Sequence, residues 1–172
     1  MHLSRPTPSR AADETAMSMP APIPDTAVLL AYARMLQGEW QSGSRPPRLR
    51  GKNIGLFGAA GDGAEATLFR RAAMELGAKV AQVHPFPDGP PSTAEVELTA
   101  RLIGRLYDAV DWPGAPADLL QVMRSAAGIP IYDGLGDAEH PTARLAGLLG
   151  VETPIADRRR FVVQAVLLAT VI

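Results

Sequence analysis

A glycine-rich turn at residues 58–63 is the stretch with the clearest chemical potential. Gly58, Gly61 and Gly63 follow a short apolar run and precede a segment in which apolar residues recur at helical spacing. Free backbone amides at the start of a helix attract phosphate and other anions, because the helix dipole is positive there. A strand, a turn of this kind and a helix therefore predict a place where an anion could sit.

The acidic residues of the turn oppose that chemistry. Asp62 and Glu65 are three positions apart, which is the spacing of a capping box with an acidic N-cap residue. Their carboxylates would satisfy the helix amides that a phosphate would otherwise use, and they would repel an anion. The glycine spacing also resembles a dinucleotide-binding turn, but the acidic residue expected after the second strand is missing, and Val83 and His84 stand there.

A second candidate group follows at His140, Pro141 and Arg144. His140 precedes a proline at a predicted helix start, so it could bind a ligand or hold the turn through its own hydrogen bond; we favour the second role. Arg144 lies one turn further on and could supply positive charge. His84 has no partner at metal-ligand spacing, so no metal site and no cofactor are expected.

Composition narrows the class of protein. The chain has 172 residues, 47% of them hydrophobic, a formal net charge of -1 and no cysteine. These values exclude disulfides, thiolate metal sites and a cysteine nucleophile, and they argue against a nucleic-acid or anionic-membrane surface. No apolar run reaches the ~18 residues that span a bilayer. We expect a cytoplasmic protein with one folded domain.

Strands and helices alternate along the chain, which predicts a three-layer α/β domain with a four-stranded parallel sheet. Proline-rich residues 1–24 are expected to be a disordered arm, and residues 25–172 a single domain. The expected helices are 25–41, capped by Asp25 or Thr26, then 64–76, 92–107, 116–127 and 141–149, and the expected strands are 53–57, 78–83, 108–112 and 129–132.

The C-terminal segment has an unusual pattern. Residues 161–172 are apolar on almost every side, which is typical of a helix buried in a groove or in an oligomer. Arg158, Arg159 and Arg160 precede it and are expected to be solvated.

Several stretches together resemble the carbamoyl-phosphate-binding half of the aspartate/ornithine carbamoyltransferases. They are Leu-Arg-Gly-Lys-Asn-Ile-Gly-Leu at 49–56, Glu-Leu-Gly-Ala at 75–78, Thr-Ala-Arg at 99–101, Asp-Ala-Val at 108–110, and Ile-Pro-Ile-Tyr-Asp-Gly-Leu-Gly-Asp-Ala-Glu-His-Pro at 129–141. Residues 157–172 resemble the family's C-terminal helix, which packs back on the first domain. The resemblance implies that the amino-acid-binding second domain is missing between these two parts.

The resemblance also implies which residues would hold the ligand. The family's phosphate loop, Ser-Thr-Arg-Thr-Arg, aligns with Asp62, Gly63, Ala64, Glu65 and Ala66, so both arginines and all three hydroxyls are absent. Pro113 stands roughly where a third phosphate-binding arginine is expected. The family's His-Pro-x-Gln becomes His140, Pro141, Thr142 and Ala143, and only the histidine remains of the groups that hold the carbamoyl moiety.

The size of the expected loss in phosphate-binding energy favours an inactive site. Losing three arginine–phosphate hydrogen bonds removes on the order of 6 kcal/mol, or about 10⁴ in affinity. We therefore expect a pseudoenzyme that serves as a binding, regulatory or scaffold subunit, pairing with a full-length carbamoyltransferase or another protein. The alternatives are a residual carbamoyltransferase acting on an amino acid such as ornithine, and a small-ligand or nucleotide-binding domain that uses the 58–63 turn. The resemblance implies a homotrimer in which residues 53–66 face a neighbouring subunit.

Overall fold

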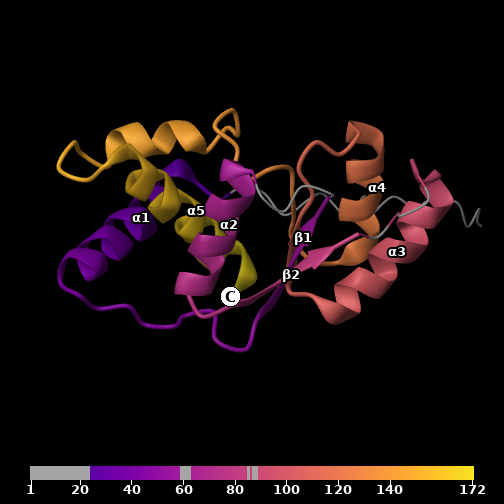
Figure 1. Ribbon diagram of the computed structural model, residues 1–172, viewed down its shortest axis with the longest axis horizontal. Helices are drawn as coiled ribbons and strands as arrows, with labels where there is room; N and C mark the ends of the chain where they lie inside the picture. The colour runs from indigo at the N-terminus through magenta and orange to yellow at the C-terminus, as the bar shows by residue number, and fades with distance from the viewer. Residues whose placement is uncertain (1–23, 59–62, 85, 87–88) are drawn as a thin grey trace, which may run out of the picture.

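The computed structural model describes residues 24–58, 63–84, 86 and 89–172. Its centre is a four-stranded, all-parallel sheet with the strand order β2-β1-β3-β4. Helices cover both faces, so the predicted three-layer α/β fold is confirmed (Figure 1). Residues 1–23 of the predicted arm, which was expected at 1–24, lie outside the described residues. The strands are β1 (Asn53–Phe57), β2 (Lys79–Val83), β3 (Ala109–Asp111) and β4 (Ile131–Tyr132).

Strand β1 is the centre of the sheet. Its residue Ile54 is in register with Val80 of β2 and with Ala109 of β3. Four of its five residues are buried, whereas β2, at the edge, is mostly exposed. The strand order requires the chain to pass from β2 over β1 to β3, and this crossover places α3 on the opposite face from α2.

Several helix boundaries carry typical capping residues. The side chain of Asp25 accepts a hydrogen bond from the amide of Ala27 (3.0 Å), and Ser92 and Glu95 form a capping box. Gly128 ends a helix in the left-handed conformation (φ 68°), which favours glycine. The helices are α1 (Thr26–Gln41), α2 (Ala64–Glu75), α3 (Thr93–Leu106), α4 (Ala117–Ala127) and α5 (Ile155–Val171).

The predicted helix at residues 141–149 is wrong in type. The chain there forms η1 (Ala143–Leu148), a 3-10 helix, whose start at Thr142 has no side-chain cap. Backbone hydrogen bonds from Leu145 to Thr142 and from Leu149 to Ala146 close these tighter turns.

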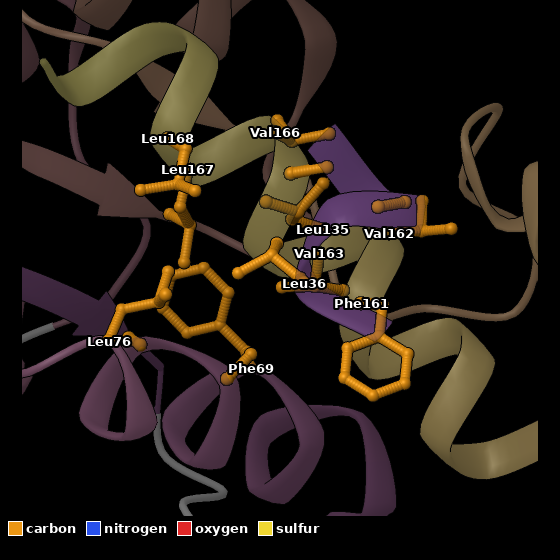
Figure 2. Close-up of a cluster of buried hydrophobic side chains, with 14 of the residues drawn as sticks. Leu36, Phe69, Leu76, Leu135, Phe161, Val162, Val163, Val166, Leu167 and Leu168 are labelled. Atoms are coloured by element: carbon orange, nitrogen blue, oxygen red, sulfur yellow. The ribbon is translucent and has the colours of Figure 1, made fainter. Parts of the chain in front are cut away.

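Two apolar cores lie on the two sides of the sheet. The larger one joins α1, α2, η1 and α5, and the smaller one joins α3 and α4 to the other face. Figure 2 shows the larger core, in which Phe69 of α2 and Leu167 of α5 point into the same space. No helix in the described part of the chain is long and apolar enough to cross a membrane.

Helix α5 fills a groove between α1, α2 and η1, as its apolar sequence predicted. Every residue from 160 to 168 is buried, and α1 packs chiefly on α5 rather than on the sheet. The expectation of solvated arginines is wrong. Arg160 is only 1% exposed and pairs with Glu75 and Asp157, while Arg158 and Arg159 donate to backbone carbonyl groups.

Helix α3 buries only some of its apolar residues. Val96 and Ile103 are buried, but Leu102 and Leu106 are 53% and 63% exposed. The reason is the close approach of α4: a Cβ at Gly104 would lie 2.0 Å from the carbonyl oxygen of Ala127. This contact turns Gly104 towards α4 and the leucines towards solvent.

Candidate functional site

The candidate site lies at the carboxyl end of the sheet. Ligands of parallel α/β sheets bind at this edge, because the loops that follow the strands meet there. Three segments reach it in this chain: the start of α2, the loop at residues 133–137 after β4, and the turn at His140. The turn residues 59–62 lie outside the described residues, so the structure does not test the nucleotide-binding alternative.

The start of α2 carries a carboxylate. The N-cap residue is Gly63, with no side-chain capping hydrogen bond, so the prediction that Asp62 is the N-cap is wrong; Asp62 itself lies outside the described residues. Glu65 is in the first turn, and its Oε2 atom would be 3.2 Å from a Cβ at Gly63. The carboxylate therefore folds back over the helix start and matches the positive end of the helix dipole. Ala64 is exposed and Ala66 is half-buried.

The loop at residues 133–137 packs directly against this helix start. A Cβ at Gly136 would lie 2.2 Å from the carbonyl oxygen of Glu65, a distance that only glycine permits. Two of the predicted segments are thus brought together, although they are about 70 residues apart in the chain.

Asp111, at the end of β3, was missed by the sequence reasoning. It is 2% exposed, and its Oδ1 atom accepts a hydrogen bond from the amide of Leu135 (3.0 Å). Burial raises the pKa of its carboxyl to about 6; the amides of Leu135 and Gly134 oppose this shift, and the nearby carboxylates of Asp133 and Asp137 add to it. The sequence signal that could have identified Asp111 is an acidic residue that directly follows two apolar residues of a strand.

His140 lies half-buried in the turn before η1. Its Nδ1 atom is 2.8 Å from Oγ1 of Thr142 and accepts a longer hydrogen bond from the Thr142 amide (3.3 Å). With Nδ1 as an acceptor, the neutral ring carries its proton on Nε2. Burial lowers the pKa of the imidazole, against the effect of Asp133 and Asp137. The ring therefore stabilises its own turn and keeps Nε2 as a donor. Pro141 is exposed.

Positive charge at this edge is already engaged or faces solvent. Arg124 donates to the carbonyl of Ile131 (3.0 Å), and Arg159 donates to that of Gly136. Arg144 is exposed on η1 and forms no hydrogen bond or ion pair with any residue that the structure describes. Pro113, also exposed, follows β3 and packs near Gly134. Within residues 24–58, 63–84, 86 and 89–172, no group of three or more His, Cys, Asp or Glu side chains could hold a metal ion.

The candidate site is thus the carboxyl edge of a parallel sheet, with a carboxylate in the first turn of α2. No protein-family model matches the chain. Over 121 residues it is 34% identical to the catabolic ornithine carbamoyltransferases of Burkholderia mallei and Burkholderia pseudomallei, a region that covers 70% of this chain and 36% of each relative. The chain therefore spans about a third of the length of these curated relatives.

Solved structures agree with this relationship. The ornithine carbamoyltransferase of Gloeobacter violaceus is 28% identical with a TM-score of 0.51, covering 72% of this chain and 39% of that one. The Burkholderia thailandensis ornithine carbamoyltransferase (19% identical, TM-score 0.60, 73% and 43% covered) and the Trypanosoma cruzi aspartate transcarbamoylase (22%, 0.55, 73% and 40%) share the fold. The homologues and structural neighbours of this chain are therefore ornithine and aspartate carbamoyltransferases, and the matched region is part of their N-terminal domain.

Proposed function

We propose that this chain is a carbamoyltransferase-like protein that has lost catalysis and acts as a binding or regulatory subunit. The observation that carries the proposal is the charge at the start of α2. Where the related enzymes are expected to hold phosphate with arginines, the aligned positions here are Gly63, Ala64, Glu65 and Ala66, which carry one carboxylate and no arginine.

Energetics support a closed phosphate site. A charge-assisted hydrogen bond contributes roughly 1.5–3 kcal/mol, whereas a helix dipole contributes about 0.3–2 kcal/mol. The dipole alone cannot replace several arginines, and Glu65 already uses it. Of the groups expected to hold the carbamoyl moiety, His140 is the only one left, and its Nδ1 atom is occupied by Thr142.

The position of α5 supports the loss of a second domain. We infer that α5 is equivalent to the family's C-terminal helix, because it packs on α1, α2 and η1 of the first domain. Only a short connector, which contains Thr153, separates it from η1. Gln37 of α1 donates to Oγ1 of Thr153 (2.7 Å) and to the carbonyl of Leu149 (3.2 Å), which fixes the connector to the domain.

Calorimetric titration with carbamoyl phosphate, with plain phosphate as the control ligand, tests the first part of this proposal. We expect no binding heat up to millimolar ligand. A matched variant, Ala64→Arg with Glu65→Gln, restores one arginine at an exposed position and removes the carboxylate. We expect it to gain measurable affinity, because it reverses the charge at the helix start. Micromolar binding by the unmodified chain, or citrulline formation by the pure protein with ornithine, would contradict the proposal.

The role as a subunit needs a separate experiment. We expect the tagged chain, expressed in its own host, to co-purify with a full-length carbamoyltransferase or another defined protein in a fixed ratio. Recovery of the chain alone at native expression levels would argue against a regulatory subunit, even if carbamoyl phosphate does not bind.

A further inference from the structure

A pocket lies at the other end of α2, away from the candidate site. It is lined by the end of α1, the connector at residues 44–46, the end of α2 and the first half of α5, and it is partly open to solvent. Glu65 and Glu75 mark the two ends of α2, so the pocket is about 15 Å along the helix from the phosphate-like position. Trp40 is one of the residues that line it.

Two arginines stack on the indole ring of Trp40. The guanidinium carbon of Arg45 is 3.7 Å from the ring centroid and that of Arg160 is 4.1 Å from it. Two guanidinium groups this close to one centroid would overlap on a single face, so they occupy opposite faces. Cation–π attraction of this kind is strongest for tryptophan.

The two arginines differ in their other contacts. Arg160 is buried, and it forms salt bridges with Glu75 and with Asp157 (3.0 Å). Arg45 is exposed, and with the residues that the structure describes it forms no hydrogen bond or ion pair. The inner guanidinium is therefore a fixed part of the fold, whereas the outer one rests on Trp40 alone.

Glu39 lines the same pocket, and one of its two carboxylate oxygens has no partner among the described residues. Oε1 of Glu39 pairs with Arg48, but Oε2 is buried and has no hydrogen-bond partner among the described residues. A buried carboxylate oxygen is strongly stabilised by a charged donor. The pocket thus combines an aromatic face that already accepts a guanidinium with an acceptor that Arg45 leaves unused.

We propose that the outer face of Trp40 and the carboxylate of Glu39 form a binding site for a guanidinium group from outside the chain, and that Arg45 competes for it. A ligand group of guanidinium size fits this site, because the guanidinium of Arg45 already fits over the Trp40 ring. An external guanidinium group, from a small molecule or from an arginine side chain of another polypeptide, would stack on Trp40 and donate to Oε2 of Glu39.

The test uses the full chain and methylguanidinium as the probe, with neutral urea as a matched ligand. Binding is followed by NMR through the indole N–H resonance of Trp40. We expect Arg45→Ala to bind methylguanidinium about tenfold more tightly than the unmodified chain, since one cation–π contact is released. Arg50→Ala, which removes an exposed arginine outside the pocket, is the matched control and should change nothing. Adding Glu39→Gln to Arg45→Ala should weaken binding again.

The outcomes separate the possible sources of the guanidinium. Much tighter binding of a short arginine peptide than of methylguanidinium indicates a protein partner, and equal binding indicates a small molecule; both support the site. If Arg45→Ala binds no better than Arg50→Ala, or if urea shifts the Trp40 resonance equally, the site does not exist. The folded state of each variant is checked by the dispersion of the same NMR spectra.

Discussion

Asp111 is a carboxyl group that the fold removes from water and then partly satisfies with loop amides. Its pKa is raised to about 6 from 3.8, so the folded state binds more protons than the unfolded state between these values. The stability that this difference contributes is complete below the unfolded pKa and is lost as the pH rises through about 6.

We expect Asp111→Asn to be more stable than the unmodified chain at neutral pH. Asparagine keeps an oxygen acceptor for the amide of Leu135 and removes the buried charge. The advantage in unfolding free energy should grow between pH 4 and pH 7 to on the order of 3 kcal/mol. Urea denaturation across this range measures it, with the exposed Asp118→Asn as the control. If the unfolding free energies of Asp111→Asn and of the unmodified chain changed with pH in the same way, the raised pKa of Asp111 would be contradicted.

Arg160 and Arg71 offer a matched test of buried and exposed charge. Both pair with Glu75 and Asp157, but the Arg160 side chain is 1% exposed and that of Arg71 is 52% exposed. We expect Arg160→Met to lower the unfolding free energy by about 3 kcal/mol, because it removes the buried partner of Glu75 and Asp157 and leaves them only the exposed Arg71. Arg71→Met should lower it by less than about 1 kcal/mol. Similar losses in chemical denaturation would show that burial is not the cause.

At the scale of elements, one glycine sets the distance between α2 and the loop after β4. Gly136→Ala would place a methyl group on the backbone of Glu65, so either the helix start or the loop must move. We expect a loss of about 1–3 kcal/mol, typical of overpacking. Gly147→Ala in η1 meets no atom within 4 Å and is the control. Equal melting temperatures for the two variants would mean that the contact is loose.

At the scale of the molecule, the open question is assembly. The related enzymes are expected to form trimers through this domain, and such contacts do not need the missing arginines. Strand β2 supports a further contact, because parallel strands are normally covered, whereas most of β2 is exposed. We predict a sedimenting species with three times the chain mass of 18.2 kDa. A monomer at micromolar concentration would overturn this prediction.

Local signals in the sequence determine much of this protein. The alternation of strands and helices, the caps at Asp25 and Ser92, and the end of α4 at Gly128 depend on residues within a few positions of one another. The burial of α5 also follows from the sequence, because a helix that is apolar all round must be covered. The resemblance at residues 129–141 places the loop and His140 next to each other.

Only the tertiary structure decides the rest, because those features depend on contacts between distant residues. Arg160 has the sequence context of a solvated residue, but the packing of α5 brings it beside Glu75, which is 85 positions away. The close approach of the Ala127 backbone to Gly104 decides which residues of α3 are buried and which are exposed. The N-cap of α2 is Gly63 rather than Asp62. The pocket at Trp40 needs α1, the connector, α2 and α5 together. Chain order does not specify such packing locally, so it appears only in the folded molecule.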